Sequence, residues 1–155
     1  MSASNRQVNG EEQGKLDAPS IIANLDRDKS HNITESIKII THSMGAAYAK
    51  GYVKALLAYA KENKIDGVKI VFEADFAPFQ PKQQKAVKDK NMGPTLQYSH
   101  NDDGVAGNSP MPGAIQMDAS KDEKQDHAIA TFTIIDVLSL PVGNYKVVNG
   151  KIVNQ

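Results

Sequence analysis

Short apolar runs alternate along the chain with longer segments of helical period. Four of these runs predict strands, at residues 36–40, 68–74, 95–99 and 114–117. Between the first two, apolar residues recur every three to four positions over 44–63, which predicts the longest helix. A second substantial helix is predicted over 122–138. Strands and helices that alternate in this way favour a mainly parallel sheet with helices on both faces.

The two ends of the chain carry different signals. Residues 1–16 are polar and rich in Gly, Asn and Gln, which predicts a flexible leader. A short helix is expected next, with Asp17 as its cap and Pro19 in its first turn. The C-terminus has two β-rich arms around Asn149-Gly150, which favours a hairpin with a type I′ turn. The predicted fold is a single α/β domain over 17–155, a three-layer, mainly parallel sheet flanked by helices, closed by a C-terminal β-hairpin.

Composition narrows the classes of function. The 155 residues carry 18 basic and 18 acidic side chains, so no net charge favours nucleic acid or an anionic membrane. The sequence has no cysteine, which removes disulfides and thiolate chemistry. No apolar run reaches the roughly 20 residues of a membrane span, so we expect no integral membrane contact. The lysine-rich stretch 82–90 is expected to be a solvated, charged connector.

The most informative stretch is 37–47, where an apolar run leads into one serine and then into a helical segment of small residues. This pattern is typical of a nucleophile elbow, in which a sharp strand-to-helix turn lifts a serine hydroxyl above the sheet. Ser43 would then be a nucleophile, and the amide of Met44 would stabilise an oxyanion. A serine at a strand–helix junction also fits a simple helix cap.

A serine nucleophile needs a base and a carboxylate that orients it. His127 comes last in the chain order serine, acid, histidine, and Asp103 lies between it and Ser43, after a predicted strand. We expect Val105 to dock inward and hold the backbone of Asp103. The pattern leaves alternatives open: Asp75 and Asp102 as the acid and His100 as the base, with turn-forming and solvated roles for the same residues.

No metal or cofactor site is predicted. His100, Asp102 and Asp103 could together supply ligands, but no pair of histidines stands at a spacing typical of metal sites. The Asp-containing loop also lacks the spacing of an EF-hand. Of the other two histidines, His42 adjoins the serine and is expected to point elsewhere, and His31 lies upstream in a polar loop.

The segment 41–45, Thr-His-Ser-Met-Gly, resembles the Gly-x-Ser-x-Gly elbow of lipases and esterases of the α/β-hydrolase superfamily. The loop 101–106 resembles the Asp-containing loop of that superfamily, and His127 with its segment resembles the terminal histidine region. The resemblance covers about 18–140 and implies only the C-terminal half of the fold, a truncated α/β-hydrolase. Thr41 replaces the leading glycine. The segment 74–81 is also similar to hydrolase-like C-terminal segments of bacterial RHS-repeat proteins.

Two functions from different classes follow. The first is a serine hydrolase acting on a small-molecule or lipid ester through Ser43, His127 and Asp103. The second is a non-catalytic binding domain, or an effector- or toxin-type terminal module, of a larger bacterial secreted or surface protein. The strands that such a truncation removes would leave a sheet edge open, which predicts a homodimer through that edge.

Overall fold

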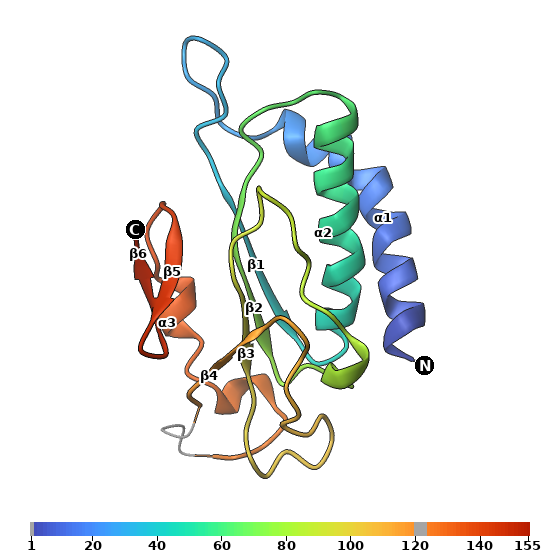
Figure 1. The fold of residues 1–155 in the computed structure, drawn as a ribbon, viewed down its shortest axis with the longest axis vertical. Helices are drawn as coiled ribbons and strands as arrows, with labels where there is room; N and C mark the ends of the chain where they lie inside the picture. Colours follow the sequence, from blue (N-terminus) through green and yellow to red (C-terminus); the bar gives the residue numbers. More distant parts are fainter. Residues whose placement is uncertain (1, 120–123) are drawn as a thin grey trace.

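A computed structural model describes residues 2–119 and 124–155 of the chain. Its centre is a sheet of four parallel strands in the order in which they occur in the sequence (Figure 1). The strands are β1 (Ile37–His42), β2 (Ile70–Phe76), β3 (Thr95–Tyr98) and β4 (Ile115–Met117). β2 is buried along its whole length, whereas β1 lies at one edge of the sheet. The edge strands are β1 and β4, so the predicted homodimer would pair through one of them. The dimer stays a prediction.

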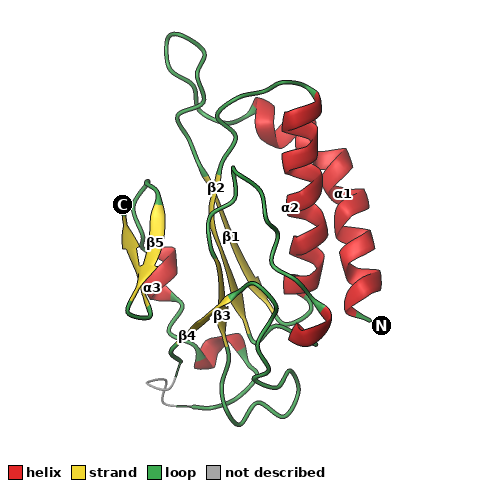
Figure 2. Cartoon of the chain, in the orientation of Figure 1, coloured by secondary structure: helices red, strands yellow, loops and turns green. Residues whose placement is uncertain are grey.

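Two long helices lie on one side of the sheet, α1 (Ala3–Ala23) and α2 (Gly45–Glu62) (Figure 2). α2 packs Val53 and Leu57 against Ile70 of β2, and α1 packs Ala18 and Ile22 against the outer side of α2. The sheet therefore has a two-helix layer on this face. Within the described residues, neither of these helices nor any other is long and apolar enough to cross a lipid bilayer.

The C-terminal part of the chain covers the opposite face of the sheet (Figure 1). It consists of the single-turn helices η2 (Ile129–Thr131) and α3 (Ile135–Leu138) and the antiparallel pair β5 (Tyr145–Val148) and β6 (Lys151–Asn154). Phe72 and Phe76 of β2 project into this layer, where they meet the rings of Tyr145 and Phe132 edge-on. A further single turn, η1 (Pro81–Gln83), follows β2.

The α/β class, the parallel strands, the helix over 44–63 and the hairpin are as predicted. The expectation that this helix is the longest is wrong, because α1 has 21 residues and α2 has 18. The hairpin turn has the predicted backbone, because Asn149 and Gly150 both have positive φ values, 50° and 73°. Strand and helix ends differ from the predicted bounds by a few residues, which is normal for elements assigned from pattern alone.

The flexible leader predicted over 1–16 is wrong. α1 begins at Ala3, runs unbroken through this segment and includes Pro19 well inside the helix. The reason is a row of small residues spaced four apart, Gly10, Gly14 and Ala18, which lets α1 press directly on the backbone of α2. A β-carbon placed on Gly10 would lie 1.9 Å from the carbonyl oxygen of Tyr48. The segment is low in hydrophobicity because close backbone packing needs few large side chains, and not because it is disordered.

The helix predicted over 122–138 is also wrong, apart from its first two residues, which lie outside the described part. Residues 124–134 contain only the single turn η2, and α3 is one turn long. The backbone carbonyls of Asp126 and His127, which a helix would need, instead accept hydrogen bonds from the side chains of His100 and His42. Tertiary contacts therefore replace the helical hydrogen bonds that the apolar period had suggested.

Candidate active site

Ser43 lies at a sharp turn between the end of β1 and the start of α2. Its φ is 54°, in the left-handed region that a non-glycine residue rarely adopts. The turn is held on both sides, because the amide of Ser43 donates to the carbonyl of Phe76 at 2.9 Å and its carbonyl accepts from the amide of Phe79 at 3.1 Å. Backbone strain of this kind costs on the order of 1–3 kcal/mol and is typically found at functional positions.

Three side chains form a continuous chain of hydrogen bonds at this turn. His127 Nε2 lies 2.8 Å from Ser43 Oγ, and His127 Nδ1 lies 2.9 Å from Asp103 Oδ2. The Asp103 side chain is fully buried, whereas 19% of the His127 side chain is exposed. An Nδ1–H that donates to the carboxylate leaves Nε2 free to accept the serine proton, which is the tautomer that nucleophilic catalysis needs.

Asp103 is fixed by the loop that follows β3. Its Oδ1 accepts from the amides of Val105 and Ala106, both at 2.9 Å, while Oδ2 faces His127. Burial opposes ionisation, but the hydrogen bonds from Ala106, His127 and Val105 outweigh it and hold the pKa of Asp103 below its ordinary value. The expected inward docking of Val105 is wrong, since 61% of that residue is exposed. An Asx-type turn, rather than an apolar anchor, holds the carboxylate.

Two other histidines hold the segment that carries His127. His42 Nε2 donates to the carbonyl of His127 at 2.6 Å, and the two imidazole rings are 5.0 Å apart. His100 Nδ1 donates to the carbonyl of Asp126 at 2.7 Å, and its buried ring stacks on Phe132 at 3.8 Å. Consecutive carbonyls are thus bound from two different strand ends. Sequence reasoning missed this arrangement, and the single available signal was that both histidines follow strands.

The structure also places the alternative residues. His100 holds backbone, as described, and Asp102 is exposed in the turn beside Asp103. Asp75 is fully buried between the sheet and α2, where it binds Thr41 and Lys50. The structure therefore brings together Ser43, His127 and Asp103, and it gives Asp75 different partners.

A buried ionic cluster lies beneath the turn, between the sheet and α2. Lys50 Nζ is 2.7 Å from Glu73 Oε1 and 2.5 Å from Asp75 Oδ2, and none of these three side chains has exposed area. Thr41 Oγ1 donates to Asp75 Oδ1 at 2.6 Å, which ties the residue two before Ser43 to the cluster. Burial disfavours the Lys50 ammonium, but the carboxylates of Asp75 and Glu73 outweigh it and hold its pKa above the ordinary value.

Glu73 is the member of this cluster whose ionised form is disfavoured. Burial and the neighbouring Asp75 carboxylate raise its pKa to about 8, against the opposing attraction of Lys50. Its Oε2 has no hydrogen-bond partner among the described residues. One ammonium is thus balanced by one carboxylate, and the second carboxyl holds its proton at neutral pH.

The start of α2 supplies the site's electrostatic element. Met44 immediately follows Ser43 and precedes the first helical residue, so its amide lies at the positive end of an 18-residue helix. A backbone donor in this position can stabilise an oxyanion that forms at the serine. Among the described residues, no three His, Asp or Glu side chains are grouped as a metal site requires.

Comparison with known proteins identifies no relative. No family model matches the chain, and neither a curated protein nor a solved structure shows significant similarity to it. The function must therefore be argued from the site itself.

Proposed function

We propose that this protein is a serine hydrolase that cleaves an ester or a related acyl bond. The observation that carries the proposal is the unbroken chain from Ser43 Oγ through His127 to Asp103, with hydrogen bonds of 2.8 and 2.9 Å. The strained φ of Ser43 and the adjacent helix N-terminus support it, because a nucleophile elbow requires both.

The proposed reaction has two stages. Ser43 Oγ attacks the carbonyl carbon as its proton passes to His127 Nε2, and the Met44 amide stabilises the resulting oxyanion. Collapse of this intermediate breaks the ester C–O bond, and His127 returns the proton to the departing alcohol. Water, activated by the same imidazole, then releases the acid and restores Ser43. Asp103 stays ionised throughout and stabilises the imidazolium.

The order of elements supports a relationship to the α/β-hydrolase superfamily. The candidate nucleophile follows β1, the acid follows β3 and the histidine follows β4, all at the carboxyl ends of parallel strands. We propose that the chain is a truncated version of that fold, in which the nucleophile strand lies at a sheet edge. The 2.8 Å between Ser43 and His127 favours a catalytic role over the binding or effector alternative, which needs no such contact.

A fluorophosphonate probe tests the proposal, because it reacts with an activated serine. The probe should label the protein once, at Ser43 by peptide mapping, and labelling should disappear in Ser43→Ala. Ser99→Ala is a suitable control, since this serine also follows a strand but accepts a hydrogen bond from Gln97. An unlabelled but well-folded wild-type protein would contradict the proposal and favour the binding module. Short-chain p-nitrophenyl esters then measure turnover.

A further inference from the structure

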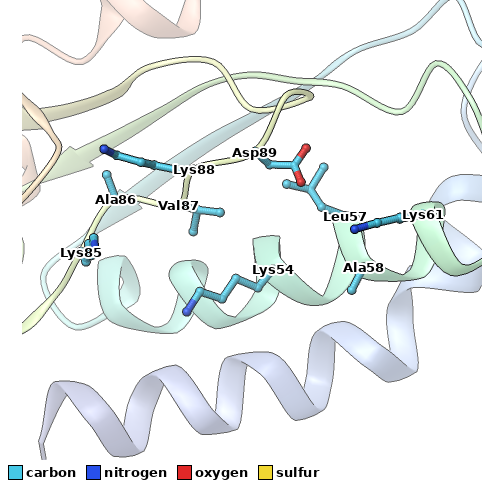
Figure 3. Close-up of a pocket in the computed structure, with 9 residues that line it drawn as sticks. All are labelled: Lys54, Leu57, Ala58, Lys61, Lys85, Ala86, Val87, Lys88 and Asp89. Atoms are coloured by element: carbon cyan, nitrogen blue, oxygen red, sulfur yellow. The ribbon is translucent and has the colours of Figure 1, made fainter.

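A cavity of about 470 Å³ lies between α2 and the lysine-rich segment that follows η1 (Figure 3). Its walls are the α2 residues Lys54, Leu57, Ala58 and Lys61 and the five consecutive residues 85–89. Figure 3 shows this segment running alongside the helix, with Val87 pointing toward it. The volume lies in the range of small-molecule sites.

The walls of this cavity differ in charge from the chain as a whole. Four lysines and one aspartate give them a formal charge of +3, whereas the net charge of the protein is zero. Among the described residues, none of these four lysines forms an ion pair. Lys54 also lines a second groove, where its positive charge helps to lower the pKa of Glu11. Asp89 Oδ1 accepts a hydrogen bond from the Asn91 amide at 2.8 Å. Of the other three lysines, Lys85 and Lys88 lie at one end of the cavity and Lys61 lies at the other (Figure 3). Lys85 and Lys88 are therefore the pair of cations that one anionic group can reach together.

The segment that presents these lysines is anchored to the fold. Ala86 is buried, and its amide donates to the carbonyl of Pro112 at 2.9 Å. Val87 packs with Val53, Leu57 and Ile70, and buried Gln84 donates to the carbonyl of Phe79 at 2.7 Å. The apolar floor and the backbone that carries Lys85 and Lys88 are thus preformed, which lowers the cost of ordering the site when a ligand binds.

We propose that this cavity binds an organic anion, with its carboxylate or phosphate beside Lys85 and Lys88 and a short apolar portion on Leu57, Ala58 and Val87. Lysine ammonium groups suit such a ligand because they act as mobile point charges on oxyanions. The lining includes none of Ser43, Asp103 and His127, so the inference does not depend on the hydrolase proposal.

Calorimetric titration with octanoate, inorganic phosphate and 1-octanol tests the proposal and separates its two parts. Octanoate carries both the charge and the apolar chain, phosphate only the charge, and octanol only the chain. The test variant is Lys85→Gln/Lys88→Gln. The control is Lys146→Gln/Lys151→Gln, which removes the same charge from exposed positions elsewhere.

Octanoate should bind the wild type more tightly than phosphate or octanol does. Its dissociation constant should rise about tenfold in the test variant, stay within about twofold in the control variant, and rise with salt. Equal loss of binding in both variants would overturn the proposal, as would octanol binding as well as octanoate. Absence of octanoate binding, or phosphate binding equally well, would exclude an organic anion as the ligand.

Discussion

The imidazole of His42 donates a hydrogen bond to the backbone carbonyl of His127 at 2.6 Å. The residue before the candidate nucleophile thus positions the backbone of the candidate base, and the same short turn fixes both partners. His127 lies just before η2, outside any helix or strand, so its backbone is positioned by side-chain hydrogen bonds such as this one.

Replacement of His42 should therefore slow the reaction of Ser43 without unfolding the protein. We expect His42→Phe to lower kcat and the rate of fluorophosphonate labelling by about tenfold or more, because small displacements of catalytic groups are costly. His42→Gln should recover part of the loss, since its Nε2 can donate in place of the imidazole. His31→Asn, in an exposed loop, is the control. If Phe and Gln were equally slow, a specific hydrogen bond would not be the cause.

We expect the Asp103 carboxylate to make the folded protein less stable as the pH falls into the acid range. Its pKa is below the ordinary value of 3.8, so the folded state binds the proton less tightly than the unfolded chain. Its stabilisation is complete above about pH 4 and is lost as the pH falls through the folded-state pKa. In urea titrations between pH 6 and pH 2, the stability gap between the wild type and Asp103→Asn should narrow as the pH falls. A gap independent of pH would count against this.

The Asp103→Asn variant should also lose activity at neutral pH. An amide in place of the carboxylate would favour the wrong His127 tautomer, and a comparable change reduces kcat by about 10⁴-fold. Ester hydrolysis measured at pH 7 checks this, with Asp102→Asn in the neighbouring turn as the control. Activity retained within a few-fold of the wild type would remove Asp103 from the proposed triad.

The raised pKa of Glu73 predicts that the free energy of unfolding depends on pH with the sign opposite to that expected for Asp103. Its pKa rises from 4.5 in the unfolded chain to about 8 in the folded protein, so the folded state keeps a proton that the unfolded chain releases. Between these values, the free energy of unfolding should fall with rising pH by up to roughly 1.4 kcal/mol per pH unit from this group. Glu73→Gln should remove that slope, whereas Glu62→Gln at the exposed end of α2 should not. Parallel pH profiles of Glu73→Gln and the wild type would refute the assignment.

Gly51 should tolerate no side chain. A β-carbon there would lie 1.9 Å from the carbonyl oxygen of Gln7, because α1 runs alongside α2 with the two backbones in contact (Figure 2). We expect Gly51→Ala to destabilise the protein by about 2–4 kcal/mol through separation of the helices. Gly45→Ala, where the new carbon would be 3.8 Å from Thr41 Cβ, should be neutral or slightly stabilising. Thermal unfolding of the two variants makes the comparison. Similar melting temperatures would rule out close helix contact.

Sequence reasoning succeeded where one local pattern determines one element. The alternation of apolar runs predicted the strands, and Asn149-Gly150 predicted the hairpin turn, since both depend on neighbouring residues. Ser43, Asp103 and His127, which the hydrogen bonds link, were also identified in the sequence from their order and from their positions after predicted strands.

The remaining features depend on contacts between distant segments. The role of Gly10 and Gly51 requires knowing that two helix backbones touch, which neither segment reveals alone. The helix predicted before Leu138 fails because His42 and His100, from other parts of the chain, take its carbonyls. Local propensity is overridden in both cases by tertiary hydrogen bonding and packing.

The contact between Ala3 and Gln80 bears on how the protein should be produced. The amide of Ala3 donates to the side chain of Gln80 at 3.0 Å, and Gln80 follows the residue whose amide holds the Ser43 carbonyl. An affinity tag fused before α1 would therefore emerge beside the loop that supports the candidate nucleophile. The opposite terminus lies at the far side of the molecule, at the end of β6 in the hairpin (Figure 1). Assays of Ser43 reactivity should accordingly use a C-terminal tag, or an N-terminal one that has been cleaved.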